Sequence, residues 1–330
     1  MCGIVGAIAE RNIVPILMEG LHRLEYRGYD SAGIAVLNGT QHLKRLRTVG
    51  KVRMLDEALE QVPTSGKIGI AHTRWATHGV PSERNAHPHL SRDGVAVVHN
   101  GIIENHDELR EELKRAGYQF TSETDTEVIA HRIHRHLQTV RDLFKAVRAT
   151  VAELEGAYAL AVVSEEDPER LILAREGCPV VIGLGVEENF VASDVAALLP
   201  VTRRFIFLEE GDVAEIRRKS IRIIDKHGNT VERPIRESEL SADAAEKGPY
   251  RHYMLKEIHE QPRAIANTLQ ERVANGRLLE AAFGPAATEV FKRTRNVHIV
   301  ACGTSYHAAA TARYFVEQIC KVPCSVDIAS

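Results

Sequence analysis

The sequence predicts an α+β fold in which helices cover sheets of mostly antiparallel strands, followed by a second unit of the α/β class. Short β-branched runs dominate the first 240 residues, and four stretches with helical periodicity lie among them. Further along, a polar stretch containing Gly-Pro precedes a strand, a small-residue turn and a helix. With 330 residues, 44% hydrophobic and 26% charged, the chain has an ordinary globular composition and length enough for two domains.

The expected strands are short apolar runs bounded by Gly, Asn, Asp or charged residues. They are residues 2–9, 31–38, 66–76, 93–101, 158–165, 171–175, 180–185, 189–193, 204–216 and 219–225. Apolar residues at helical spacing predict helices over 14–25, 107–116, 126–137 and 143–153. Because each helix has one apolar face to bury, these elements predict a layered sandwich.

A domain boundary is expected where the strand pattern stops. We assign residues 1–240 to the first domain, 241–250 to a linker and 251–330 to the second domain. The second domain begins with helices over 253–272 and 288–293, and a strand, turn and helix follow in 296–320. One such unit cannot bury both faces of its sheet, so the chain is expected to be a fragment of a longer one.

Charge and apolar patterning exclude several classes of protein. The 42 Lys and Arg residues against 45 Asp and Glu give a formal charge of −3. The chain therefore lacks the excess positive charge that is typical of proteins that bind nucleic acid or an anionic membrane. No run approaches the roughly 18 apolar residues of a membrane span, and no basic segment precedes an apolar start. We therefore expect a cytoplasmic protein. The five cysteines form no C-x-x-C pair and do not predict a disulfide framework.

Cys2 is the first candidate for a catalytic residue. Removal of Met1 would leave a thiol and a free α-amino group on one residue. The amine, with a pKa of about 7.7–8.0, can accept the proton of a thiol whose pKa is near 8.5. The alternative is that Cys2 is only a small residue before a buried strand.

Two polar segments at expected strand ends, 71–79 and 97–105, suggest the rest of a site. Attack on an amide creates an oxyanion, which the side-chain N–H₂ of Asn100 and the backbone N–H of Gly101 would stabilise. The alternative for this Asn-Gly pair is a hairpin turn. An amino-acid substrate also offers a carboxylate, which suits Arg74, and an ammonium, which suits Asp125. Alternatively, Arg74 is a surface cation and Asp125 or a neighbour caps the helix that follows.

Several motifs together resemble one enzyme family. MCGIVGAI, EYRGYDSAG, AHTRWATHG, NAHPH, HNGIIEN, ETDTE and CGTSY are similar to those of the glutamine:fructose-6-phosphate aminotransferases (isomerising), also called glucosamine-6-phosphate synthases. The resemblance runs through all 330 residues. It implies a four-layer α/β/β/α sandwich of the N-terminal-nucleophile hydrolase type, followed by the start of a sugar isomerase domain.

The resemblance also implies residue roles. Cys2 is expected to be the nucleophile and Asn100 and Gly101 the oxyanion hole. The residues expected to hold glutamine are Arg74, Thr77, His78 and Asp125, with a further contact from Gly101. Trp75 would gate an ammonia channel, unless it is a packed aromatic, and Thr304 and Ser305 would contact a sugar phosphate, unless they only cap a helix. The partners implied are glutamine and fructose 6-phosphate, with a homodimer for the full-length protein.

Neither an organic cofactor nor a metal is expected. The 16 His residues include His131, His134 and His136 on one expected helix, where solvated side chains are the simpler interpretation. The resemblance implies that the full-length protein hydrolyses glutamine and transfers the ammonia to fructose 6-phosphate, giving glucosamine 6-phosphate, and that this fragment alone acts only as a glutaminase. Two other functions compete with this one. The glutaminase could serve another acceptor, as in amidophosphoribosyltransferase, although the CGTS turn argues against it, or the chain could be a silent module that senses glutamine or sugar phosphate.

Overall fold

The computed structural model describes residues 2–39, 42–75, 79–92, 94–238, 249–269, 272–274, 277–283 and 286–329. The chain divides into two compact units, Met1–Pro249 and Tyr250–Ser330, each of which is described by itself. Of the expected linker, residues 241–250, only the last two positions lie among the described residues.

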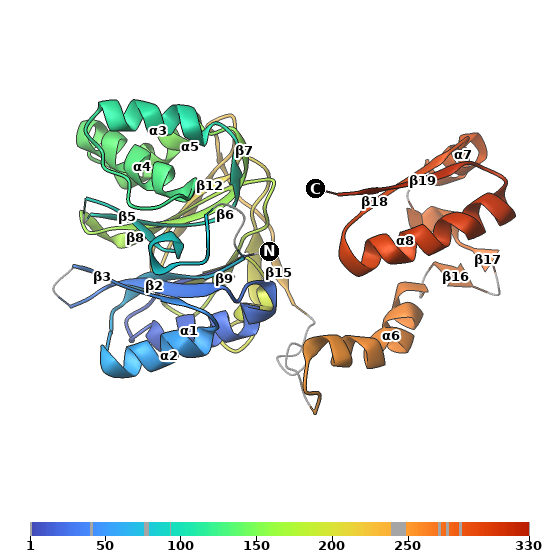
Figure 1. Cartoon of the computed structure of the whole chain (residues 1–330), viewed down its shortest axis with the longest axis horizontal. Coiled ribbons are helices and arrows are strands. Elements are labelled where there is room, and N and C mark those ends of the chain that lie inside the picture. Colours follow the sequence, from blue (N-terminus) through green and yellow to red (C-terminus); the bar gives the residue numbers. More distant parts are fainter. Residues whose placement is uncertain are drawn as a thin grey trace. The chain divides into compact units, whose positions relative to one another are not determined.

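Two antiparallel sheets form the centre of the first unit (Figure 1). One sheet has the spatial order β15-β11-β9-β10-β1-β4-β2-β3 and the other β14-β13-β12-β8-β7-β6-β5. The strands of the first sheet are β1 (Gly3–Ile8), β2 (Ser31–Leu37), β3 (Leu43–Val49), β4 (Ile68–Arg74), β9 (Val181–Leu184), β10 (Asn189–Ala192), β11 (Arg204–Phe207) and β15 (Ile235–Glu237). Those of the second are β5 (His89–Ser91), β6 (Val95–Ile103), β7 (Gly156–Ser164), β8 (Asp167–Glu176), β12 (Val213–Ile216), β13 (Ile221–Ile224) and β14 (Thr230–Val231).

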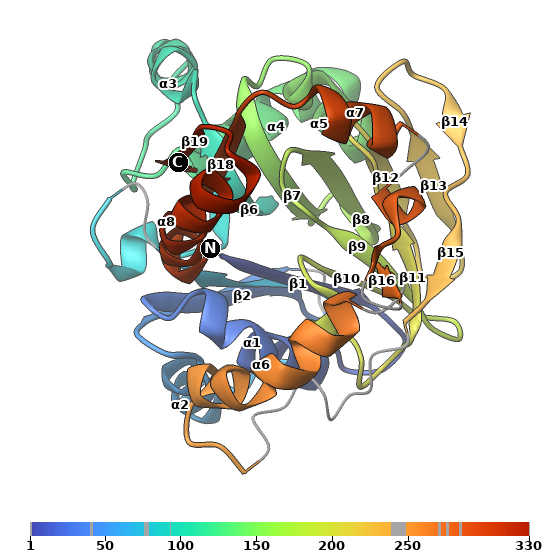
Figure 2. The ribbon, with the colours of Figure 1, turned by 90° about the vertical axis from the view of Figure 1, so that its right-hand side faces the viewer.

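Helices cover the outer face of each sheet (Figure 2). The helices α1 (Val14–Leu24) and α2 (Val52–Gln61) lie on the first sheet, whereas α4 (Thr126–Val140) and α5 (Leu143–Val151) pack on the second and α3 (His106–Arg115) packs on α4. One apolar cluster lies between each sheet and its helices. A third cluster is buried between the two facing sheets and includes Ile4, Ile70, Val98 and Leu173. The expected α/β/β/α sandwich of four layers is therefore confirmed.

Local sequence explains how α1 and α4 begin and end. Pro15 occupies the first turn of α1, where its missing N–H costs nothing, and Leu17, Leu21 and Leu24 bury one face. The helix α4 runs three residues beyond its expected end and stops at Arg141, which has a left-handed backbone (φ 49°).

The second unit contains a parallel strand pair. The strands β18 (Val297–Ala301) and β19 (Cys324–Ile328) pair in parallel, and α8 (Gly303–Phe315) connects them, continued by a π-helical turn over Val316–Cys320. Before them lie α6 (Tyr253–Leu269), β16 (Val273–Ala274), β17 (Arg277–Leu278) and α7 (Ala287–Arg293). This strand, helix and strand are the α/β arrangement that the sequence predicts.

Candidate active site

Cys2 lies directly before β1, a central strand of the first sheet. Because β1 runs antiparallel to β4, with Gly3 opposite Thr73, the start of one strand meets the end of the other. The Sγ atom of Cys2 accepts the backbone N–H of Trp75 at 3.3 Å. Burial raises the pKa of the Cys2 thiol, and the Trp75 N–H and the positive charge of Arg74 oppose this only in part. A base is therefore needed to make the thiolate near neutral pH.

Arg74 is buried beside the cysteine and is not a surface cation. Only 4% of its surface is exposed. Its Nη2 donates to the carbonyl of Gly79 at 3.2 Å, and its Nη1 lies 3.9 Å from Oδ1 of Asp30. A guanidinium held in this way offers a fixed positive charge at the end of β4.

Asn100 approaches Cys2 from the facing sheet, and Gly101 follows it in the same strand. Both lie within β6 and pair with β7, so the hairpin-turn interpretation is excluded. Nδ2 of Asn100 donates to the carbonyl of Cys2 at 3.2 Å. Gly101 has φ +128°, and a Cβ atom there would come within 1.9 Å of the carbonyl oxygen of Ala157, so only glycine fits.

Asp125 is buried just before α4 but caps no helix. Its Oδ2 accepts the backbone N–H of Ile103 in β6 at 2.9 Å, whereas no side chain makes a capping hydrogen bond at the start of α4. The helix-cap interpretation is therefore wrong for Asp125. Instead, the aspartate is fixed against β6, two residues beyond Gly101.

Of the remaining residues expected at this site, the structure describes Trp75 only. Thr77 and His78 lie outside the described residues. Trp75 is 46% exposed, and its ring meets the ring of Tyr29 edge to face at 5.4 Å. It is therefore no packed core aromatic, because nearly half of it faces solvent.

Several polar residues of this region were not assigned a role from the sequence. His72, His87, His89 and His99 are buried. His72 contacts Asn100 in the facing sheet, whereas His89 and His99 contact Thr124 and Thr126 at the start of α4. Glu127, in the first turn of α4, accepts the backbone N–H groups of Thr121 and Ser122 and so holds the segment that leads to Asp125. The signal for Glu127 was present in the Ser and Thr residues five to six positions before it. The histidines carried no comparable signal.

The solvated interpretation of the histidines on α4 is wrong for two of them. His131 and His134 are buried, and their Nδ1 atoms lie 2.8 Å from Oγ of Ser91 and from the hydroxyl of Tyr118. The polar side of α4 is covered by the segment around Tyr118 rather than by water. Among the described residues, no group of three His, Cys, Asp or Glu side chains could hold a metal ion.

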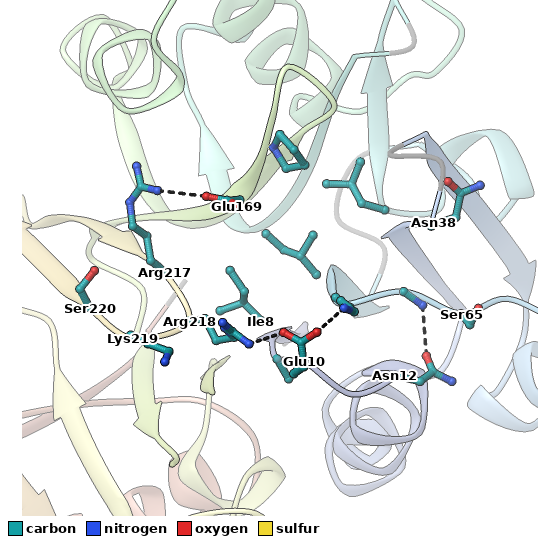
Figure 3. A pocket seen from close by; sticks show the side chains of 17 residues that line it. Ile8, Glu10, Asn12, Asn38, Ser65, Glu169, Arg217, Arg218, Lys219 and Ser220 are labelled. Atoms are coloured by element: carbon teal, nitrogen blue, oxygen red, sulfur yellow. Dashed lines mark hydrogen bonds and ion pairs between the residues drawn. The ribbon is translucent and has the colours of Figure 1, made fainter. Parts of the chain in front are cut away.

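A cleft of about 770 Å³ opens at the other end of the strands (Figure 3). It is lined by the last residue of β1, the start of β4 and the turn at 217–220, so it lies away from Cys2. Its charged side chains pair with one another, since Glu10 contacts both Lys67 and Arg218. The cleft is therefore separate from the cysteine site.

Thr304 and Ser305 are exposed in the first turn of α8. Cys302 is the residue before this helix, and no side-chain hydrogen bond caps it. The capping alternative for Thr304 and Ser305 thus has no support from the geometry.

The helices of the described residues include none with the length and apolar character of a membrane span.

The four-layer sandwich has the fold of the N-terminal-nucleophile hydrolase type, the class to which glutamine amidotransferase domains belong. Residues 72–200 match the family model described as a glutamine amidotransferase domain. Over all 330 residues the chain is 60% identical to the glutamine–fructose-6-phosphate aminotransferases (isomerizing) of Pseudomonas aeruginosa and Shewanella oneidensis. It covers 54% of each of them and so spans about half the length of the curated relatives it matches.

Solved structures agree on the fold. The allosteric regulatory enzyme of purine biosynthesis is 28% identical with a TM-score of 0.61, over 69% of this chain and 50% of that chain. The glutamine phosphoribosylpyrophosphate amidotransferase of B. subtilis is 23% identical with a TM-score of 0.60, over 98% of this chain and 65% of that chain.

Proposed function

We propose that the chain hydrolyses glutamine with Cys2 as its N-terminal nucleophile, and that the whole protein transfers the ammonia to fructose 6-phosphate to give glucosamine 6-phosphate. The observation that carries the first part is the meeting of Cys2, at the start of β1, with Arg74 from the same sheet and Asn100 from the facing sheet. The second part rests on the 60% identity to aminotransferases of that name. That identity also favours fructose 6-phosphate over a phosphoribosyl acceptor.

The chemistry begins when Met1 is removed and the α-amine of Cys2 becomes free. The amine takes the thiol proton, because burial keeps the thiol itself protonated near neutral pH. Sγ attacks the side-chain carbonyl of glutamine, and Nδ2 of Asn100 and the N–H of Gly101 stabilise the oxyanion. The C–N bond breaks as the ammonium returns a proton to the departing ammonia. Water then hydrolyses the thioester to glutamate and the free thiol.

Glutamine is held by its two charged groups. Arg74 binds the carboxylate and Asp125 the ammonium, since both side chains are buried and fixed before substrate arrives. Thr77 and His78 complete the glutamine site, and Trp75, which is half exposed next to Cys2, gates the path of ammonia. In the second unit, Thr304 and Ser305 contact the sugar phosphate at the exposed first turn of α8. The full-length protein acts in the cytoplasm as a homodimer.

The test follows glutamate release by the purified chain after mass spectrometry has verified the loss of Met1. We expect hydrolysis by the wild type and by Cys178→Ala, which removes a half-buried thiol elsewhere, and none by Cys2→Ala. Hydrolysis by folded Cys2→Ala would contradict the assignment of Cys2 as the nucleophile. The acceptor is tested with the full-length protein, where incorporation of ammonia into fructose 6-phosphate supports the proposal and its absence contradicts it.

A further inference from the structure

The amide of Asn100 has a buried partner on the side opposite Cys2. His72, in β4, is fully buried, and its Nε2 lies 3.1 Å from Oδ1 of Asn100. The same nitrogen is 3.1 Å from the backbone carbonyl oxygen of His99 and 3.2 Å from Nδ1 of His87. The backbone carbonyl oxygen of His99 can only accept, so Nε2 of His72 must carry the proton whichever way the amide of Asn100 is turned.

The rest of the imidazole agrees with this tautomer. Burial lowers the pKa of His72 to about 3, so the ring is neutral near pH 7 and has a single N–H. Its Nδ1 is buried and has no hydrogen-bond partner among the described residues. With the proton on Nε2, only a lone pair is left unsatisfied there. The other tautomer would bury an unpaired N–H and turn a bare nitrogen toward two oxygens.

This donor determines which way the amide of Asn100 points. With Oδ1 bound to His72, Nδ2 faces Cys2 and donates to its carbonyl at 3.2 Å. The flipped amide would set its N–H₂ against the N–H of His72 and its oxygen against the carbonyl of Cys2. Both contacts would then be repulsive.

We propose that His72 is a positioning residue that holds the amide of Asn100 with its N–H₂ toward Cys2, so that the oxyanion donor is in place before glutamine binds. The inference rests on the proposed function, which makes Asn100 that donor. An oxyanion donor acts through preorganisation, and the loss of one costs about 10²- to 10³-fold in kcat. His72 controls a part of that effect without touching substrate.

The kinetic test compares His72→Phe, which has the shape of the ring but no donor, with His72→Gln, whose side-chain N–H₂ can still reach Oδ1 of Asn100. We expect His72→Phe to lower kcat for glutamine hydrolysis by roughly 10- to 100-fold, with KM changed by less than about 2-fold, and His72→Gln to recover most of the loss. In an Asn100→Ala background the Phe substitution should change kcat by less than about 3-fold. Equal losses in both backgrounds would overturn the proposal.

Two further measurements separate positioning from folding and from the proposed function. Alkylation of Cys2 by iodoacetamide creates no oxyanion, so its rate should stay near wild type in His72→Phe, the variant that is expected to lose kcat, and the Tm should stay near wild type in His72→Gln. In the wild type, ¹⁵N chemical shifts of the imidazole should show His72 protonated on Nε2 and unchanged from pH 5 to 8. A proton on Nδ1, or titration near pH 6.5, contradicts the positioning role whether or not the chain hydrolyses glutamine. Conversely, the expected tautomer in a chain without glutaminase activity refutes the proposed function and with it the catalytic use of this contact.

Discussion

Gly101 is a residue at which backbone geometry leaves no choice of side chain. Its φ of +128° is unfavourable for any residue with a Cβ atom, and the carbonyl of Ala157 lies where that atom would be. The position is set by the pairing of β6 with β7, next to Asn100. A change at Gly101 therefore acts on both the sheet and the proposed oxyanion hole.

We predict that Gly101→Ala lowers the free energy of unfolding by at least about 2 kcal/mol and abolishes glutamine hydrolysis, because β6 must shift away from β7. Urea unfolding and glutamate release measure the two effects. The matched control is Gly94→Ala, where the nearest atom to the new Cβ is 3.9 Å away. It should change stability by less than about 0.5 kcal/mol. Wild-type stability of Gly101→Ala would contradict the close approach to Ala157.

The buried histidines make the fold sensitive to mild acid. Burial lowers the pKa of His72 to about 3 and lowers the pKa values of His87 and His89 as well. An unfolded histidine binds its proton near pH 6.5, so below that pH the unfolded chain binds more protons than the native one. Stability is therefore fully present above pH 6.5 and falls as the pH drops toward the folded pKa.

Between pH 6.5 and 5.5 we predict a loss of about 1 kcal/mol for each of these three histidines, about 3 kcal/mol together. Urea unfolding at a series of pH values measures the slope. His89→Gln keeps a donor for Oγ1 of Thr124, which lies 3.0 Å from Nε2 of His89, and should reduce the slope by about a third. A slope unchanged in this variant would assign the acid sensitivity to other groups.

For single residues, the role of a side chain depends on its surroundings in the fold more than on its residue type, so the sequence predicted only some of the roles. Cys2, Arg74 and Asn100 were identifiable because their chemistry is unusual at a chain start or at a strand end. The capping interpretation of Asp125 failed because its actual partner is the N–H of Ile103, 22 residues earlier in the sequence. His72 could not be assigned from sequence, since its role depends on burial and on contacts with another sheet.

Among the elements, the segment before α4 shows how one carboxylate orders a loop. Glu127 accepts the N–H and hydroxyl groups of both Thr121 and Ser122. Burial acts to raise the pKa of Glu127, but these hydrogen bonds prevail and lower it. The loop that they fix ends at Asp125, the proposed ligand of the glutamine ammonium.

We predict that Glu127→Gln destabilises the protein by roughly 2–4 kcal/mol, because the new amide turns donors toward the N–H groups of the loop. It should also raise KM for glutamine, since Asp125 loses its support. Chemical denaturation and steady-state kinetics measure these effects. Glu111→Gln, which removes only an exposed i,i+3 pair with Lys114, should leave both near wild type. An unaltered KM would mean that Glu127 does not position Asp125.

The elements that the sequence analysis missed differ in how much signal they carry. The helix α2 has apolar residues at helical spacing, Val52, Leu55 and Leu59, so its pattern was present in the sequence and was not recognised. The strand β3, LKRLRTV, is an edge strand with half-buried cations, which is typical of protected edges and atypical of apolar runs. The run at 204–216 was expected as one strand, but the structure divides it into β11 and β12, which belong to different sheets. Pattern alone does not reveal that a chain changes sheets.

For the whole molecule, the division into two units predicts that the first is independent. Among the described residues, the buried members of the three large apolar clusters and of the smaller one beneath α3 all precede residue 225. We therefore predict that residues 1–249 alone fold with a Tm within about 4 °C of that of the whole chain and hydrolyse glutamine. Thermal denaturation and glutamate release check this. A truncated protein that does not melt cooperatively would show that the first unit depends on the second.

The central place of β1 also bears on the order of events during synthesis. Its residue Val5 pairs with Ala192 of β10, so one neighbour of this strand is made long after the strand itself. At 5–20 residues per second, the ribosome needs about 10 to 40 s to produce that partner. During this interval the start of the chain remains without a complete sheet, within reach of an aminopeptidase. The time needed for translation thus provides a window in which Met1 can be removed before the thiol is enclosed.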